Sequence, residues 1–329
     1  SVESVVTLLF ANAQAYRALE GLPQMSDTDR QQISQQVGIG VQRLYAWQKV
    51  DGGWGWFARD NSDPAMTAYA LLGLVELRDL GFTIESDVID NAISYLKGSF
   101  ITPTDQTEQW RLNRQAFVLY ALTRAGAGEP ARTANLYELR AQLSLWSQAL
   151  LAVTVAAVDG NNTRANVLIS DLVSDAAISA NGVSWQEQTQ DVYNWNTNTR
   201  TTAMIAHALI RLNPSHPLIP NVIRWLMAAR TVDRWETTQE TGWALQALAD
   251  WSIASGDAQP FGNGHVRRCN RREFDGDSPG RRELDGVAEQ VEQDLPEAHL
   301  VATDTLRHRV GDGVAEGDVP VGEDDLHRP

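Results

Sequence analysis

Apolar residues recur three and four positions apart through most of the first 254 residues, a spacing that predicts α-helices. Gly and Pro separate these stretches, as they commonly do between helices. Residues 182–185 have a pattern that favours extended backbone, but no stretch strongly indicates a β-hairpin. We expect helices at 5–19, 28–48 (with a candidate break at Gly38 and Gly40), 65–77, 87–97, 112–124, 163–179, 198–212, 221–230 and 237–254, and two more within 135–158.

The stretch 41–80 shows most clearly how the chain is organised. A helix ends near Gln48, a loop of Gly and Trp follows at 51–56, and a second helix begins at Asp63-Pro64. The Asp63 side chain can accept hydrogen bonds from the first turn, and Pro64 suits the first helical position because it has no N–H to leave unpaired. The second helix is apolar around most of its surface, so we expect it to be buried on more than one side.

Similar helix pairs recur along the chain. The separation between residues 41 and 54 equals that between residues 222 and 235, and a polar cap and an Ala/Leu-rich helix follow each time. One helical hairpin cannot bury its own apolar face, so a repeat of roughly 40 to 50 residues predicts a solenoid or a closed ring. The sequence therefore predicts an all-α fold, an α/α toroid of repeated helical hairpins with the more apolar second helices inside. The Trp residues assigned to the repeats are Trp54, Trp110, Trp195 and Trp235.

The composition changes sharply near Gly256. Every Trp, Tyr, Lys, Met and Ile precedes it, whereas Arg, Gly, Asp, Glu, Val and Pro dominate the rest. Such a segment cannot bury enough apolar surface to offset the cost of ordering the chain. We therefore expect a toroid at 1–254 and a disordered acidic tail at 255–329. A reading-frame error in GC-rich DNA would yield the same amino-acid composition, and a natural acidic tail is the alternative.

Bulk properties exclude several classes of function. The net charge of −15 argues against nucleic acid as a partner, because phosphates demand clustered Lys and Arg. No run of about 18 apolar residues is present, so we expect no membrane span. Cys269 is the single cysteine and cannot form an internal disulfide. The chain starts at Ser1 without an initiator Met or a charged-then-apolar leader, so we expect a removed leader or an internal piece of a longer protein.

Few residues are candidates for catalysis or metal binding. The helical region has no Asp-x-Asp-Asp run, and the lone cysteine lies in the tail, so we expect no zinc site, no other metal and no cofactor. His207 lies within a predicted helix without a Glu or second His at metal-binding spacing, and we interpret it as a structural residue. His216, between two prolines, is interpreted as a loop residue. Thr237 and Glu240 have the spacing of a capping box, on a first turn where Glu236 and Glu240 are expected to be solvated.

The loop formed by Gln48, Asp51, Gly52, Gly53 and Trp54 resembles the Q-x-x-D-G-x-W repeat of triterpene cyclases and their toroid relatives. A catalytic loop would imply a cyclase or a prenyltransferase. The favoured interpretation is structural, because the acidic cluster and the zinc ligands of those enzymes are missing. Gln48 and Asp51 would tie the loop to a helix end, the glycines would permit tight backbone, and Trp54 would pack between neighbouring hairpins.

Residues 1–12 resemble the thioester segment of the α2-macroglobulin family, in which Cys-x-Glu-Gln precedes a Leu-rich helix. The stretch DGGWGWF, followed by Asp63-Pro64 and TAYAL, is similar to the middle of bacterial members. Residues 235–241, WETTQET, resemble the signature near the end of the same domain and include Trp235, Thr238 and Gln239. The resemblance covers about residues 1–254.

The resemblance implies the thioester-containing toroid of a large protease-trapping protein. In the family, the Cys sulfur and the Gln carbonyl form a buried thioester that bait cleavage exposes to nucleophiles of the protease. Ser1 and Ser4 stand at the Cys and Gln positions here, and Glu3 is retained, so the resemblance implies a degenerate site without a thioester.

The expected function is therefore that of a non-catalytic fragment of a bacterial alpha-2-macroglobulin-like endopeptidase inhibitor, which traps proteases sterically. Its partners would be proteases and other domains of the same large chain, in an extracytoplasmic setting (periplasmic, cell-surface or secreted). The alternative is an α/α-toroid enzyme, either a terpene cyclase relative or a polysaccharide lyase, and a third interpretation is a plain binding scaffold. An acidic cluster in the central cavity would favour a cyclase, and a cleft lined by Tyr, His and Arg would favour a lyase.

Overall fold

The computed structural model describes residues 1–19, 27–160, 162–231 and 234–255, and α-helices dominate them. Apart from residue 255, the predicted tail lies outside the described residues. The all-α prediction is confirmed. The helices are α1 (Val2–Leu19), α2 (Asp27–Trp47), α3 (Pro64–Asp79), α4 (Ser86–Gly98), α5 (Gln109–Arg124), α6 (Pro130–Glu138), α7 (Leu145–Asp159), α8 (Thr163–Ser174), α9 (Asn198–Leu212), α10 (Ile219–Ala228) and α11 (Thr238–Ser255), with a short 3-10 turn at Arg140–Gln142.

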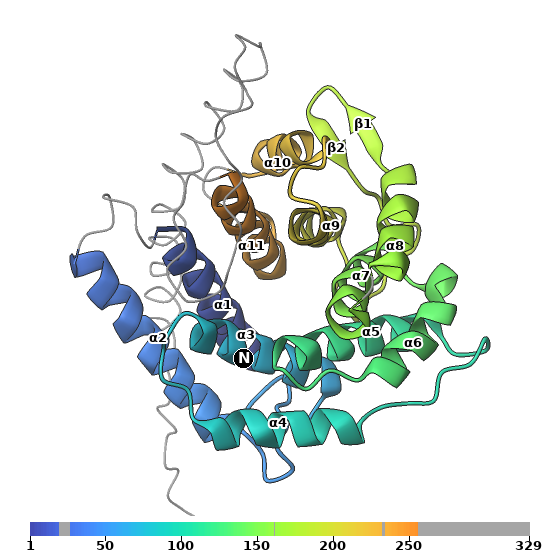
Figure 1. Cartoon of the computed structure of the whole chain (residues 1–329). Coiled ribbons are helices and arrows are strands. Elements are labelled where there is room, and N and C mark those ends of the chain that lie inside the picture. Colours follow the sequence, from blue (N-terminus) through green and yellow to red (C-terminus); the bar gives the residue numbers. More distant parts are fainter. Residues whose placement is uncertain (20–26, 161, 232–233, 256–329) are drawn as a thin grey trace, which may run out of the picture.

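Every second helix belongs to an inner ring. Helices α1, α3, α5, α7, α9 and α11 each pack against the next, and α11 packs against α1, so that the described ring is closed (Figure 1). Helices α2, α4, α6, α8 and α10 lie outside it, each against the inner helix that precedes it. The inner helices are buried nearly all round, as α3 is from Ala65 to Leu77. This division between inner and outer helices follows the predicted difference in apolar character.

Helix caps set several of the boundaries. The Asp63 carboxylate accepts a hydrogen bond from Met66 N at 3.0 Å, with Pro64 at the first helical position of α3. Thr237 and Glu240 form a reciprocal capping box at the start of α11, with bonds of 3.0 and 3.1 Å. Helix α2 runs through Gly38 and Gly40 without the break that the sequence suggested.

The structure corrects the prediction for residues 163–179. Helix α8 ends at Ser174, and an antiparallel hairpin follows, formed by β1 (Ala177–Ser179) and β2 (Gly182–Ser184). Gly182 adopts a φ of +127°, and a Cβ there would lie 2.2 Å from the carbonyl oxygen of Asn221. A side chain at this position would therefore prevent β2 from packing against α10, with which it makes contact. The strands are only three residues long, too short for a clear alternating pattern.

A buried polar chain crosses the ring interior and joins its first helix to its last. Arg17 of α1 forms a 2.5 Å ion pair with Asp250 of α11. Asp250 also accepts a hydrogen bond from His207 Nδ1 of α9, and His207 Nε2 lies 2.9 Å from the hydroxyl of Tyr120 on α5. Because Asp250 can only accept, Nδ1 carries the proton and Nε2 accepts from the Tyr120 hydroxyl.

The charges in this chain are set by burial and by their partners. Burial lowers the pKa of His207 from its ordinary value of 6.5, against the attraction of Asp250, and keeps the imidazole neutral. Burial alone would raise the pKa of Asp250, but Arg17 and His207 outweigh it and hold the pKa well below its usual range. Asp250 is therefore a buried carboxylate whose charge depends on Arg17.

Replacing Asp250 by Ala should lower the free energy of unfolding by about 3–5 kcal/mol, because it leaves the largely buried Arg17 without its counter-charge. Chemical denaturation of the full chain measures the change. The control is Glu108→Gln, which breaks the exposed Arg111–Glu108 pair and should cost less than about 1 kcal/mol. Equal effects of the two substitutions would contradict a role for Asp250 in closing the ring.

The buried His207 should also make stability depend on pH. Its pKa is lowered in the folded chain, so between that value and 6.5 the unfolded chain binds more protons, and acidification destabilises the fold. The free energy of unfolding should therefore rise with pH up to about 7. His207→Gln should remove the part of the pH dependence of the unfolding free energy that comes from this imidazole. His216→Gln, in a half-buried turn, should change that pH dependence less. If the unfolding free energies of His207→Gln and of the unsubstituted chain changed in parallel with pH, His207 would not be the source of the pH dependence.

Candidate functional site

The N-terminal turns of the inner helices gather on one face of the ring, which we call the N-terminal rim. Glu3 of α1 bonds to Thr238 of α11 at 3.0 Å, and Thr197, the N-cap of α9, donates to Glu240 of α11 at 2.6 Å. Asn113, near the start of α5, donates to the hydroxyl of Ser144, the N-cap of α7, at 2.8 Å. Arg114 of α5 pairs with Asp63, the N-cap of α3, at 3.3 Å. The rim therefore collects polar residues from all parts of the described chain.

The positions that resemble the thioester segment lie on this rim. The hydroxyls of Ser1 and Ser4 are 2.8 Å apart and bonded to each other, and Ser4 N donates to Ser1 Oγ at 3.1 Å. Ser1 is exposed, while Glu3 and Ser4 are half-buried. A hydrogen bond between two hydroxyls thus joins Ser1 and Ser4.

Glu3 is the centre of a small hydrogen-bond cluster. Its Oε1 accepts from Thr7 Oγ1 at 2.9 Å, from Thr238 Oγ1 at 3.0 Å and from Gln239 Nε2 at 3.3 Å. Thr7 in turn lies 3.0 Å from the buried hydroxyl of Tyr69. Two motifs at opposite ends of the helical sequence, SVES and WETTQET, therefore meet at one carboxylate. The positive ends of α1 and α11 both favour a negative charge at this place.

The loop that resembles the cyclase repeat makes packing contacts. Gln48 Nε2 donates to the carbonyls of Gly52 at 3.0 Å and Val88 at 2.9 Å, which ties the loop to α4. Asp51 Oδ1 accepts from Gly53 N at 3.0 Å and from the Ser62 hydroxyl at 2.8 Å. Neither Gln48 nor Asp51 lines the rim pocket described below or the smaller cavity beside Arg111 and Arg114, and both side chains hold the turn between α2 and α3 in shape.

A buried Trp with a bonded indole defines the structural repeat. Each indole N–H donates to a carbonyl in the last turn of the preceding outer helix. Trp54 and Trp185 also share a second contact, since their backbone N–H groups donate to Thr67 and Thr202 of the following inner helix. The indole pairs are Trp54 with Leu44 O (2.8 Å), Trp185 with Leu172 O (2.6 Å) and Trp235 with Leu226 O (2.9 Å).

Two of the Trp residues that the sequence assigned to the repeats, Trp110 and Trp195, do not occupy the repeat position in the structure. Trp185, not Trp195, is the equivalent of Trp54 before α9. Trp195 lies on the rim with a φ of +54° and packs edge-on against Trp56, with ring centroids 4.6 Å apart. Trp110 is on the first turn of α5 and packs against Tyr193 at 4.8 Å. Spacing to the next helix could not separate these roles, because Trp195 precedes the first residue of α9 by the same interval as Trp235 precedes the first residue of α11.

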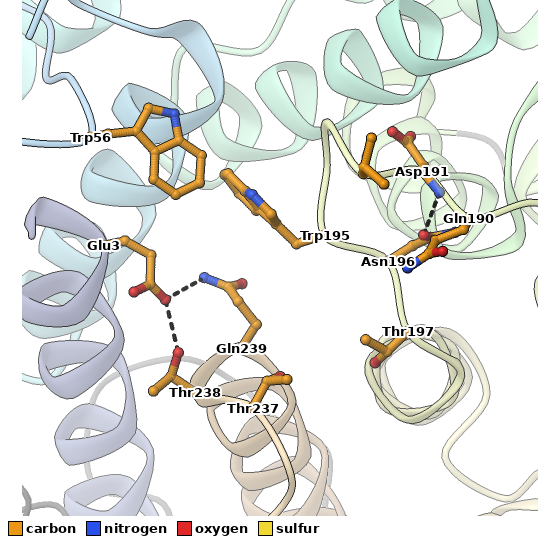
Figure 2. Close-up of a pocket in the computed structure, with 11 residues that line it drawn as sticks. Glu3, Trp56, Gln190, Asp191, Trp195, Asn196, Thr197, Thr237, Thr238 and Gln239 are labelled. Carbon is orange, nitrogen blue, oxygen red and sulfur yellow. Dashed lines mark hydrogen bonds between the residues drawn. The ribbon is translucent and has the colours of Figure 1, made fainter.

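A cavity of about 420 Å³ opens beside Glu3 on the rim (Figure 2). We call it the rim pocket. Figure 2 shows the Glu3 carboxylate bonded to Thr238 and Gln239, with the indoles of Trp56 and Trp195 next to it. The remaining lining residues are Gln190, Asp191, Val192, Asn196, Thr197 and Thr237.

The loop before α9 is the part of the site that sequence reasoning missed. Asp191 Oδ2 accepts from Asn194 at 2.7 Å and from Asn113 at 2.9 Å, and Asn196 Oδ1 accepts from Asp191 N at 2.6 Å. Arg200, which is fully buried, donates to Asn194 O at 2.9 Å, and burial lowers its pKa to about 10. The signal was a run of Asp and Asn before a helix, which alone indicates only a loop.

The other candidate residues from the sequence, two histidines and two glutamates, make contacts typical of structural residues. His207 is buried and bonded through both nitrogens, and His216 lies in a turn, as the sequence predicted. Glu236 is exposed, but the prediction for Glu240 as a solvated residue is wrong, because it is buried between the caps of α9 and α11. Within the described ranges, no group of three or more His, Cys, Asp or Glu side chains is arranged to hold a metal ion.

Tyr120, His207 and Arg17 do come together, as a lyase would require, but inside the core. Tyr120 and His207 are each 2% exposed, and neither lines the rim pocket or the smaller cavity beside Arg111 and Arg114. Two of the buried carboxylates, Glu76 and Asp250, are paired with Arg124 and Arg17. None of the helices in the described ranges combines the length and apolar character needed to cross a membrane.

Comparison with known proteins identifies relatives of this chain. The model of the A-macroglobulin TED domain matches residues 1–251. An alpha-2-macroglobulin of Thermotoga maritima is 40% identical over 58 residues, which are 18% of this chain and 4% of that protein. An alpha-2-macroglobulin of Rickettsia conorii is 26% identical over 159 residues, which are 47% of this chain and 8% of that protein. The chain thus matches only a small part of these relatives.

Two bacterial structures illustrate the likeness in fold. Salmonella alpha-2-macroglobulin reacted with methylamine gives a TM-score of 0.60 at 21% identity, over 76% of this chain and 16% of that one. Trypsin-activated alpha-2-macroglobulin from Escherichia coli gives a TM-score of 0.58 at 21% identity, over 77% of this chain and 17% of that one. At this identity the likeness shows the fold.

Gly52→Ala should destabilise the chain more than Gly81→Ala, although both glycines have a φ of +89°. A Cβ at Gly52 would lie 2.3 Å from the carbonyl oxygen of Asn91, whereas one at Gly81 would meet nothing within 4 Å. Gly81→Ala should cost about 1–2 kcal/mol for the left-handed backbone alone. The further loss in Gly52→Ala, about 1–3 kcal/mol by denaturation, measures the clash with α4. Equal losses would show that the turn can move away from α4.

Proposed function

The chain belongs to the A-macroglobulin family through its TED domain, and we propose that it serves a larger endopeptidase inhibitor that traps proteases without a thioester. The domain itself is non-catalytic in this proposal. Other domains of the same large chain supply the bait and enclose the protease, and the ring described here is one part of the enclosing body. Proteases are the targets, and the setting is extracytoplasmic: periplasmic, cell-surface or secreted.

The observation that carries the proposal is the pair of hydroxyls at Ser1 and Ser4. A thioester needs a thiol sulfur and an acyl carbon, and two serine side chains supply neither. Their mutual 2.8 Å hydrogen bond satisfies both groups in place of a covalent link. Glu3 carries a carboxylate, but it is engaged by Thr7, Thr238 and Gln239. The polar cluster around the former reactive position therefore supports a structural use of these residues.

The relatives support the involvement of proteases. Their solved structures include alpha-2-macroglobulin from Escherichia coli activated by trypsin and by porcine elastase. We extend this response to the present chain: cleavage elsewhere in the protein changes the packing of the domains around the ring. Retention of the protease then depends on enclosure alone, because no acyl group is available for attack.

An α/α-toroid enzyme is the less favoured alternative. The rim pocket contains neither a run of carboxylates nor a His, and the Tyr120–His207 pair is buried away from it. A carboxylate that is to protonate a substrate must reach the substrate, and the interior carboxylates of Glu76 and Asp250 are neutralised by arginines.

Methylamine treatment of the full-length chain that contains these residues should add no mass to residues 1–4. Intact-mass and peptide analysis measures this, and the Salmonella protein, whose structure is known after reaction with methylamine, is the positive control. The double variant Ser1→Cys, Ser4→Gln is treated in parallel, because it carries the Cys and Gln of the family motif at these two positions. An adduct within residues 1–4 of the unsubstituted chain would overturn the proposal.

The second measurement is the state of a trapped protease. After mixing with trypsin, the full-length chain should shield the protease from a macromolecular inhibitor while leaving it accessible to a small substrate. The protease should then separate from the chain under denaturing electrophoresis, because no covalent bond joins them. A trypsin band that stays attached after denaturation would contradict non-covalent trapping, and a freely inhibited protease would contradict trapping itself.

A further inference from the structure

A cavity of about 200 Å³ lies beside the first turns of α5 and is also lined by the start of α3 and by the loop that follows α4. We call it the arginine pocket. Arg111 and Arg114 of α5 line it, and no carboxylate does within the described part of the chain. The whole chain has a formal net charge of −15, so its overall field repels anions. A cavity lined by two cations is therefore a local exception.

Both arginines of the pocket have N–H groups that no other described residue uses. Arg111 donates only through Nε, to the exposed Glu108 at 3.0 Å. Arg114 donates to the Asp63 carboxylate and to the carbonyl of Tyr193, each at 3.3 Å, from its two terminal nitrogens. Neither Glu108 nor Asp63 lines the cavity. Because a guanidinium group has five N–H donors, several of them remain for a ligand.

The two cations lie where helix electrostatics disfavours them. The start of an α-helix is its positive end, and α5 has no acidic residue in its first turn. The guanidinium carbons of Arg111 and Arg114 lie 4.9 and 5.1 Å from the centroid of the Trp110 ring, which brings the two positive charges close together. The indole attracts each cation, but it does not remove their mutual repulsion. An anion beside both guanidinium groups would offset that repulsion.

Gln115 supplies an independent indication of a ligand. The residue is only 5% exposed, and its Oε1 accepts a hydrogen bond from Ile101 N at 3.2 Å. Its Nε2 has no hydrogen-bond partner in the described chain. This nitrogen is not among the unpaired atoms that are fully enclosed, so it opens into the cavity that Gln115 lines. A nearly buried amide with a free donor is unfavourable, and an acceptor bound in the cavity would pair it.

Most of the remaining lining is apolar, and it includes Trp110, Phe100, Ile101 and Val118. None of the large apolar residues that are exposed in the described chain lines this cavity, so it lacks the apolar surroundings typical of a protein contact. Apolar walls with a few convergent polar groups are typical of a site for a small molecule. The volume lies below the range for drug-sized ligands, which limits the occupant to a small one.

From these features we propose that the arginine pocket binds a small free carboxylate whose apolar body is no larger than one aromatic ring. The carboxylate group lies between the guanidinium groups of Arg111 and Arg114 and accepts a hydrogen bond from Gln115 Nε2. A planar carboxylate matches the geometry of a guanidinium group, and hydrogen bonds between such charged groups are strong. The apolar body contacts the Trp110 ring and the side chain of Val118. This site involves none of residues 1–4 and does not depend on protease trapping.

Three probes test the proposal on the full-length chain at neutral pH. Phenylacetate, its uncharged isostere phenylacetamide, and acetate are each titrated calorimetrically. Phenylacetate should bind at least about tenfold more tightly than either of the others, because the amide lacks the charge and acetate lacks the ring. Equal affinity for phenylacetamide, equal affinity for acetate, or no binding of phenylacetate would each overturn the proposal. The last result includes the case in which another part of the full-length protein covers the cavity.

Two variants assign the contacts. Gln115→Glu keeps the acceptor for Ile101 N and replaces the free donor by an oxygen that repels a carboxylate. It should weaken the binding of phenylacetate at least about tenfold and that of phenylacetamide less. Arg111→Gln removes one guanidinium group at a half-exposed position, so that folding does not depend on it, and should weaken phenylacetate several-fold. An unchanged affinity for phenylacetate in either variant would overturn the proposal.

The matched control is Arg78→Gln, which removes an arginine of similar exposure near the C-terminal end of α3 that does not line the arginine pocket. It should leave the affinities for all three probes unchanged. Circular dichroism checks that each variant is folded like the unsubstituted chain. Equal losses of phenylacetate binding in Arg78→Gln and Arg111→Gln would mean that overall charge attracts the anion, and would overturn the assignment of the site.

Discussion

The structure depends on closing the ring between its first and last helices. Helices α1 and α11 are far apart in sequence, yet each must bury a face that no local hairpin covers. Two polar contacts join them at different heights: Glu3 with Thr238 and Gln239 on the rim, and Arg17 with Asp250 in the interior. The entropic cost of bringing two chain segments together rises only slowly with the number of residues between them. The burial of apolar surface along both helices can therefore offset this cost. Without closure, the apolar faces of α1 and α11 would be exposed.

Closure also explains why the polar chemistry lies where it does. The inner helices begin on the same rim, so their N-terminal dipoles all favour negative charge there. Asp63, Glu187 and Glu240 each accept backbone N–H groups at or near helix starts on this face. Glu3 lies on the same face but accepts from side chains, and it lines the cavity that Trp56 and Trp195 also line. The same arrangement that stabilises the ring therefore places these carboxylates together on one rim.

Ser1 and Ser4 are peripheral to the core, so the identity of their side chains has little effect on the packing of the ring. Their hydroxyls bond to each other and need no buried partner. The packing of the repeats depends instead on Trp54, Trp185 and Trp235, whose indoles fix the outer helices to the inner ring. The side chains at positions 1 and 4 and the packing of the ring are thus physically independent. The thioester-free role proposed above is therefore compatible with an intact ring.

The sequence by itself determined the helices, the caps at Asp63 and Thr237, and the division into inner and outer layers, because helix periodicity and capping are local properties. It also indicated the positions of Ser1, Glu3 and Ser4 through the motif. Only the tertiary structure decided that Trp185 and not Trp195 belongs to the repeat, that Glu240 is buried, and that Glu3 lies beside Gln239 and the two rim indoles. The physical reason is distance along the chain. These contacts join segments that lie far apart in the sequence at irregular intervals. Which residues meet is therefore decided by how the ring closes, and the residues next to them in the sequence do not indicate it.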